Sequence, residues 1–131
     1  MFNINARIYY EDTDAGGIVY YANYLKFLER ARTEFLRSIG FAGSSDLYKE
    51  NPFGFAVRKV NIEYLRPAVL DDLLTVTCEI TNVGGASIVC KQQIFRGEEQ
   101  LIDAEVTCVH MDLTKLRPVK IPQNMREKFS L

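Results

Sequence analysis

The sequence contains little of what nucleic-acid binding, membrane insertion or secretion requires. Its 16 Lys and Arg are balanced by 17 Asp and Glu, which gives a formal net charge of −1, whereas nucleic-acid binding depends on clustered cations. No apolar run approaches the roughly 20 residues that cross a bilayer. The N-terminus lacks the charged stretch followed by an apolar one that marks a signal peptide. We therefore expect no nucleic-acid partner, no transmembrane segment and a cytoplasmic location.

Cysteine and histidine are also scarce, which limits the chemistry available to the chain. Cys78, Cys90 and Cys108 are odd in number and widely spaced, whereas zinc sites use close pairs and secreted disulfide frameworks use even counts. We interpret them as core thiols of a protein in a reducing compartment, and we expect no metal site. The single histidine, His110, lies in a strand-like run with no acidic partner evident in the sequence, so we expect it to be structural.

The 131 residues are a typical length for one domain, and no repeat, low-complexity tract or linker divides them, so we expect a single domain over residues 1–131. Alternating and helical periodicities predict strands over 3–10, 55–64, 74–80, 87–96 and 101–111, helices over 23–40 and 123–129, and a polar loop over 43–52. A phase slip near Arg58 and Lys59 adds a β-bulge. One long helix followed by consecutive strands indicates an α+β domain, with a mostly antiparallel sheet wrapped around the helix.

The ends and the polar face of the long helix can also be predicted. Asn23 is a candidate N-cap, and Gly40 is placed to stop the helix. On the polar face, Glu34 is spaced to pair with both Arg30 and Arg37. The edges of the sheet that covers the apolar face would be open to a second subunit.

The sharpest local feature is the segment Asp-Thr-Asp-Ala-Gly-Gly at residues 12–17, just ahead of the long helix. Taken alone, it is most simply a polar turn whose Asp side chains accept hydrogen bonds from nearby amides. A calcium loop would need a further ligand in place of Gly16 and an acid in place of Asn23. A phosphatase of the Asp-x-Asp type would need a magnesium site and a larger α/β scaffold, which the order of elements does not provide.

A third hypothesis is catalytic. An Asp just ahead of a helix N-terminus lies beside oriented backbone N–H groups and the positive end of the helix dipole. These donors would stabilise an oxyanion while the carboxylate attacks a carbonyl or activates water. Gly16 and Gly17 would let a substrate approach the backbone. Such a site needs no His, Cys or Ser nucleophile, but the spacing alone leaves the polar turn and the catalytic site as open alternatives.

Several segments together resemble a known enzyme family: residues 10–24, 27–32, 57–68 and 71–74, with Arg117-Pro118 and Ile121-Pro122 near the C-terminus. They are similar to the hot-dog-fold acyl-CoA thioesterases, in the branch of 4-hydroxybenzoyl-CoA thioesterase and the Tol–Pal-associated thioesterases. The resemblance implies a hot-dog fold, with one long central helix wrapped by a five-stranded sheet. It also implies hydrolysis of an acyl-CoA to free acid and CoA without a cofactor, because coenzyme A is part of the substrate. It further implies a homo-oligomer, either a homodimer or a homotetramer built as a dimer of dimers, with active sites at the subunit interface.

The same resemblance assigns roles to individual residues. Asp14 would be the catalytic carboxylate, acting as nucleophile or general base, and the backbone N–H of Tyr21 would polarise the thioester oxygen. Asp12 would organise the loop. The expected substrate-binding residues are the two loop glycines, the aromatic and polar residues around the helix start, and two basic residues for the CoA phosphates: Gly16, Gly17, Tyr20, Asn23, Tyr24, Arg58 and Lys59.

Two departures from the family pattern are visible. Tol–Pal-type relatives usually carry His where this chain has Tyr21, and a phenol, which ordinarily titrates at about 10, cannot replace imidazole at neutral pH. The turn at residues 84–87, which is basic in some relatives, has no cation here, so Arg96 joins the two basic residues named above as a candidate for phosphate contacts. A non-hydrolytic acyl-CoA-binding or regulatory protein is the main alternative. A dehydratase on the same fold is disfavoured, because His110 falls outside the motif.

Overall fold

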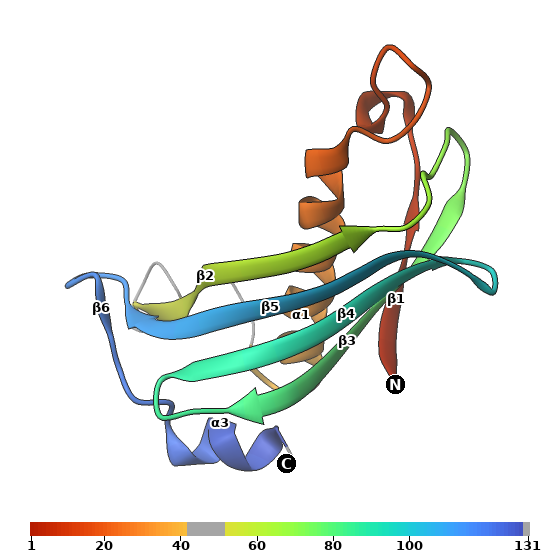
Figure 1. Cartoon of the computed structure of the whole chain (residues 1–131). Coiled ribbons are helices and arrows are strands. Elements are labelled where there is room, and N and C mark those ends of the chain that lie inside the picture. The colour runs from red at the N-terminus through yellow and green to blue at the C-terminus, as the bar shows by residue number, and fades with distance from the viewer. Residues whose placement is uncertain (42–51, 130–131) are drawn as a thin grey trace.

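The computed structural model describes residues 1–41 and 52–129. Five long strands form one antiparallel sheet in the order β1 (Phe2–Arg7), β3 (Leu73–Val83), β4 (Ser87–Arg96), β5 (Glu99–Asp112) and β2 (Phe53–Tyr64), and the short β6 (Arg117–Pro118) pairs with β5. Figure 1 shows this sheet curling around the long helix α1 (Tyr24–Ser38), with the short helix α3 (Gln123–Lys128) at one end. The predicted α+β architecture is confirmed. Most of the predicted loop over 43–52 lies outside the described residues.

The core forms where the apolar stripe of α1 meets the concave face of the sheet. Tyr24, Phe27, Leu28 and Ala31 are the buried residues of the helix. The sheet contributes alternating inward side chains from its three central strands, among them Leu74, Val76, Ile94, Ile102 and Val106. The three cysteines are buried and unbonded to one another by disulfides, as predicted. Period-2 and period-3.6 patterns therefore identified the correct faces of the sheet and the helix.

Strand β2 contains the predicted bulge. Its register with β5 shifts between Val57 and Lys59, so Arg58 is the extra residue. β2 and β1 are the outer strands of the sheet order. Along β2, Val57 and Val60 remain exposed.

Three local expectations need correction. The first strand ends at Arg7, before residue 10, because Tyr10–Asp12 forms a 3-10 turn, η1, in which the Asp12 carboxylate accepts the Tyr9 N–H. Asn23 occupies the N-cap position of α1, but its side chain makes no capping bond. Arg30 was expected to pair with Glu34 and instead places its guanidinium 5.5 Å from the centre of the Phe27 ring.

Other features of the helices agree with the sequence analysis. Glu34 pairs with Arg37 at 3.5 Å. Gly40 follows the end of α1 with φ +94°, a left-handed conformation that glycine adopts without strain, so it stops the helix as predicted. The C-terminal helix is present as α3. Among residues 1–41 and 52–129, no helix combines the length and the apolar character needed to cross a membrane.

One buried polar side chain joins the helix to the sheet. Gln92 is fully buried, and its Nε2 donates to the carbonyls of Leu28 at 2.9 Å and Thr77 at 3.2 Å. Its Oε1 accepts a hydrogen bond of 3.0 Å from Arg32. All hydrogen-bonding groups of this amide therefore have partners, as a buried polar group requires.

Replacing Gln92 with Met should lower the free energy of unfolding by about 1–3 kcal/mol, because the carbonyls and the guanidinium that it satisfies lose a partner. Chemical denaturation measures the change. Gln93→Met is the matched control, since Gln93 is the next residue of β4 and only half-buried; its effect should stay within about 0.5 kcal/mol. Equal effects of the two substitutions would contradict this account of Gln92.

Candidate active site

Asp12 connects the loop between β1 and α1 to the start of that helix. Its Oδ2 accepts the Tyr9 N–H at 2.8 Å. Its backbone carbonyl accepts the Tyr20 N–H at 3.0 Å and the side-chain amide of Asn23 at 2.8 Å. The polar side chain of Asn23 therefore stabilises the loop and not the helix end. Both residues are structural supports of the segment that contains Asp14.

Asp14 lies at an exposed turn that two glycines make possible. Its Oδ1 accepts the Gly16 N–H at 2.8 Å, and a Cβ at Gly16 would lie only 3.2 Å from this oxygen. Gly17 has φ +84° and donates its N–H to the Asp14 carbonyl at 3.1 Å. The Asp14 N–H donates to the carbonyl of Ile18 at 2.8 Å. In the described part of the chain no hydrogen bond reaches Oδ2, so one carboxylate oxygen is oriented and the other is open to solvent.

The helix begins a few residues after this turn. A 3-10 turn, η2 (Tyr21–Asn23), leads directly into α1. The first N–H groups of a helix have no acceptor within it. Among residues 1–41 and 52–129, the Tyr21 N–H donates no hydrogen bond, whereas the Asn23 N–H donates to the Tyr20 carbonyl at 2.8 Å. The helix dipole adds a partial positive charge at this end. An open amide and an exposed carboxylate are thus placed on one short connection.

Aromatic side chains surround the helix start. The rings of Tyr20 and Tyr21 lie 4.9 Å apart, and the Tyr64 ring lies 6.2 Å from Tyr21 and 5.8 Å from Tyr24. Tyr24 is 3% exposed, and its hydroxyl accepts the Ala68 N–H at 3.0 Å. This buried side chain therefore holds the loop between β2 and β3, which contains Ala68. The Coulombic and hydrogen-bonding influence of Tyr21 raises the pKa of Tyr20, and burial raises the pKa values of Tyr24 and Tyr64.

Tyr64 was not among the predicted site residues, although it contacts Tyr21. It shares the alternation phase of Val60 and Ile62, which suggests an ordinary strand side chain. Its position as the last residue of β2 leaves it 45% exposed beside the helix start. The one signal in the sequence was that Tyr64 is the last residue of the predicted strand, before Leu65 and Arg66, where a side chain can extend beyond the sheet.

The candidate phosphate-binding residues lie elsewhere in the single chain. Arg58 and Lys59 are exposed at the bulge of β2. At about 3.3 Å per residue, the bulge is some 16–20 Å along the strand from Tyr64. Arg96 is already paired, at 2.6 Å, with both Asp72 and Glu99. Within one chain, therefore, Arg58 and Lys59 lie away from the Asp14 turn, and the guanidinium of Arg96 is occupied by two carboxylates.

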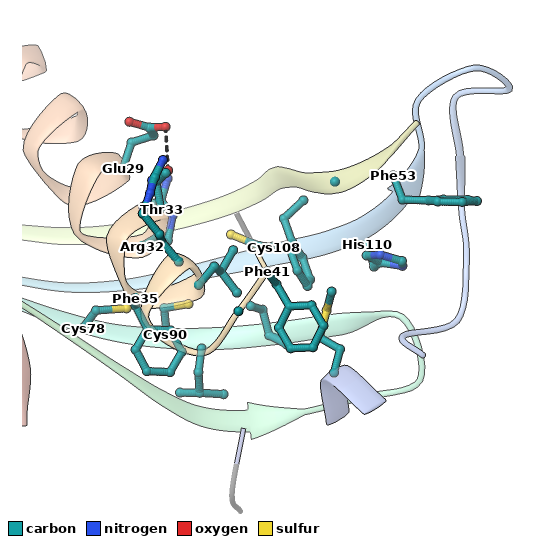
Figure 2. A pocket seen from close by; sticks show the side chains of 18 of the residues that line it. Glu29, Arg32, Thr33, Phe35, Phe41, Phe53, Cys78, Cys90, Cys108 and His110 are labelled. Carbon is teal, nitrogen blue, oxygen red and sulfur yellow. Dashed lines mark hydrogen bonds between the residues drawn. The ribbon is translucent and has the colours of Figure 1, made fainter. Parts of the chain in front are cut away.

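A separate cavity of about 600 Å³ lies between the C-terminal half of α1 and the sheet (Figure 2). Its walls include Phe35, Phe41, Phe55 and Met125, the three cysteines, His110 and Arg32, and none of the residues of the Asp14 turn. A hydrogen bond from Cys108 lowers the pKa of Cys90, but a bond with Cys78 and burial outweigh it and raise the value to about 12. The bond with Cys90 and burial raise the pKa of Cys108 as well. These thiols are neutral and not activated as nucleophiles.

His110 is buried in β5, and its Nδ1 lies 3.2 Å from the Val119 carbonyl. Its ring lies 6.0 Å from that of Phe53 and 5.2 Å from that of Phe55. These contacts fit the structural role predicted for it. In the described part of the chain, no group of three or more His, Cys, Asp or Glu side chains is arranged to hold a metal ion.

Comparisons with known proteins agree on one family. The family model described as the thioesterase superfamily matches residues 16–102. The acyl-CoA thioesterase YbgC of Haemophilus influenzae is 44% identical over 128 residues, covering 98% of this chain and 93% of that protein.

Solved structures support the same conclusion. A probable thioesterase from Bartonella henselae superposes with a TM-score of 0.81 at 38% identity, covering 92% of this chain and 96% of that one. The 4-hydroxybenzoyl-CoA thioesterase of a Pseudomonas strain superposes with a TM-score of 0.86 at 24% identity, covering 96% of each chain. The hot-dog fold expected from the sequence is thereby confirmed.

The environment of His110 predicts a pH dependence of stability. Burial lowers its pKa, although the hydrogen bonds of the ring oppose this. The unfolded chain therefore binds this proton more readily, and the folded state loses stability as the pH falls through about 6.5, the ordinary histidine value. Denaturation at about pH 7.5 and about pH 5 should show a larger loss for the wild type than for His110→Asn, which cannot titrate. The same pH dependence in both proteins would contradict the assignment.

Proposed function

Because the chain belongs to the thioesterase superfamily, we propose that it hydrolyses an acyl-CoA thioester to a free acid and CoA, with Asp14 as the catalytic carboxylate. The name of the Haemophilus influenzae relative supports acyl-CoA as the substrate class. The observation that carries the proposal is the exposed Asp14 carboxylate, which lies a few residues ahead of η2. The first amide of η2, at Tyr21, donates no hydrogen bond in the described part of the chain, and η2 leads directly into α1.

Two chemical routes use this arrangement. In one, a carboxylate oxygen of Asp14 attacks the thioester carbon, CoA leaves as the thiolate, and water hydrolyses the resulting anhydride. In the other, the carboxylate removes a proton from a water molecule that attacks the same carbon, and the C–S bond breaks so that CoA again leaves as the thiolate. In both routes negative charge develops on the carbonyl oxygen, where the Tyr21 N–H and the helix dipole would stabilise it. Gly16 and Gly17 keep side chains away from the approach to the loop.

Neither route requires the other reactive groups of the chain. His110 is buried in β5, and Cys90 and Cys108 hold their protons at neutral pH. The Asp14 carboxylate is instead held in an exposed position by its bond to the Gly16 N–H. This contrast supports a carboxylate mechanism over a thiol or imidazole one.

We also propose that the active enzyme is a dimer or a dimer of dimers. β2 forms an outer edge of the sheet, and Val57 and Val60 on it are 50% and 37% exposed. Exposed strand edges and apolar side chains favour association with a second copy. Such a partner would add groups to the Asp14 site that a single chain lacks, and Arg58 and Lys59 on the same edge remain candidates for the CoA phosphates.

Asp14→Asn should reduce the kcat for release of free thiol by about 10²–10⁴-fold, because the amide can neither attack the carbonyl nor accept a proton. A thiol-reactive dye measures release from short-chain, long-chain and aromatic acyl-CoAs. Asp12→Asn is the matched control: its amide oxygen can still accept the Tyr9 N–H, so a much smaller loss is expected. Unchanged thiol release in Asp14→Asn would overturn the mechanism, and binding of acyl-CoA without turnover by the wild type would favour the non-hydrolytic alternative.

Tyr21→Pro tests the amide directly. Proline is tolerated at the first position of a helix and removes the N–H, here together with the Tyr21 ring, and the extended conformation of Tyr20, with φ −60° and ψ 130°, suits a following proline. We expect kcat to fall by about 10²–10³-fold relative to Tyr21→Ala, which also loses the ring but keeps the N–H. Equal kcat values for the Pro and Ala variants would exclude this amide as the oxyanion donor.

A further inference from the structure

The Asp14 turn packs against a second loop, residues 67–72, which we call the supporting turn. The Val19 N–H donates to the Ala68 carbonyl at 2.9 Å, and Ile18 forms an antiparallel bridge with Val69. Figure 1 shows the two loops side by side at the end of the molecule where α1 begins. The position of the Asp14 turn is therefore determined by the position of the supporting turn.

One carboxylate binds the supporting turn next to the contact with Ile18. Oδ2 of Asp72 accepts the Val69 N–H at 2.9 Å and a hydrogen bond from Nη1 of Arg96 at 2.6 Å. The same Nη1 lies 3.4 Å from the carbonyl of Pro67. Glu99 fixes the other side of the guanidinium, with Nε at 3.1 Å and Nη2 at 2.6 Å from its Oε1. Charge-assisted bonds of this kind are stronger and more directional than neutral ones.

The backbone of the supporting turn needs such external support. Asp71 has φ +72°, a left-handed conformation that is uncommon for residues other than glycine. The neighbouring strand end contributes two bonds: the Asp71 N–H donates to the Ile8 carbonyl at 3.0 Å, and Arg7 donates to the Asp71 carbonyl at 2.6 Å. These bonds hold the C-terminal end of the turn. Its middle is held at Ala68 by the Tyr24 hydroxyl and at Val69, where the turn meets Ile18, by Asp72 and Arg96.

We propose that Asp72 and Arg96 are positioning residues for Asp14. Their effect passes through Val69, which Asp72 binds, to Ile18, whose carbonyl accepts the Asp14 N–H at 2.8 Å. The inference rests on the proposed function, in which Asp14 is the catalytic carboxylate. Small displacements of a reacting group are costly, because about 1 Å can reduce the rate up to about 100-fold. Arg96, considered above for phosphate binding, has this internal role instead.

A purely structural role predicts that activity falls only as far as the amount of folded protein falls. The side chains of Arg96 and Asp72 are 32% and 15% exposed, and neither belongs to the apolar core between α1 and the sheet. Loss of the pair should therefore leave the domain folded, although less stable because charge-assisted bonds are lost, while it displaces the Asp14 turn. The positioning role predicts a fall in kcat that exceeds any loss of folded protein.

The test compares Arg96→Gln with Arg66→Gln. Arg66 forms an ion pair of the same length, 2.6 Å, with the same Glu99, but it does not bind Asp72. For Arg96→Gln we expect kcat to fall between about 10-fold and 100-fold with KM changed less than about two-fold. Arg66→Gln should keep the wild-type kcat. Arg96→Lys, whose ammonium can still bind one carboxylate, should show a smaller fall in kcat than Arg96→Gln.

Amide hydrogen exchange supplies a readout that activity does not. In Arg96→Gln, the amides of Asp14 and Val19 should exchange faster, because their acceptors Ile18 and Ala68 lie on the displaced contact. Amides in the centre of β4 and β5, such as those of Cys90 and Val106, should exchange at the wild-type rate. Unchanged exchange at Asp14 and Val19, or equal kcat losses in the Arg96 and Arg66 variants, would overturn the proposal.

The proposed function and the positioning role can fail separately. If Asp14→Asn keeps wild-type thiol release, the proposed function is wrong and the positioning role falls with it. If Asp14→Asn is inactive while Arg96→Gln retains the wild-type kcat, only the positioning role is wrong.

Discussion

The burial of one apolar stripe of α1 is the constraint on which the rest of the structure depends. The helix places Phe27, Leu28 and Ala31 against the sheet, and the sheet curls to cover them (Figure 1). Gln92 ties the middle of the helix to the sheet through the Leu28 carbonyl. Because this contact leaves the helix little freedom to slide or rotate, its N-terminus is held at one end of the sheet, and with it the first open amides.

The candidate site follows from that placement. The loop that connects β1 to the helix start turns at Gly16 and Gly17, and this turn leaves Asp14 exposed. Asp12 holds the loop in place by accepting the Tyr9 N–H. The supporting turn holds this loop from the other side through Val69 and Ala68. In the proposed mechanism this carboxylate acts without a neighbouring imidazole, because the Gly16 N–H orients it.

The reactive groups of the molecule lie in two separate places. The cavity beneath the C-terminal half of α1 contains neutral thiols and a buried imidazole (Figure 2), whereas the exposed turn at the opposite end of the helix contains the acid and the open amide. Burial explains the contrast, since it favours the uncharged form of a thiol or an imidazole. Asp14 lies instead in the exposed turn, where its carboxylate meets water and the Gly16 N–H.

The sequence by itself determined the kind and order of the elements, the inward faces of the strands, the bulge at Arg58 and the burial of the cysteines. Each of these depends on a period of two or 3.6 residues or on a local turn preference, so neighbouring residues suffice to predict it. Tertiary structure alone decided that Asn23 would bind the Asp12 carbonyl, that Tyr64 would meet Tyr21, and that Arg96 would hold Asp72. These partners are distant along the chain and meet only because the sheet curls around the helix, which no local pattern of residues encodes.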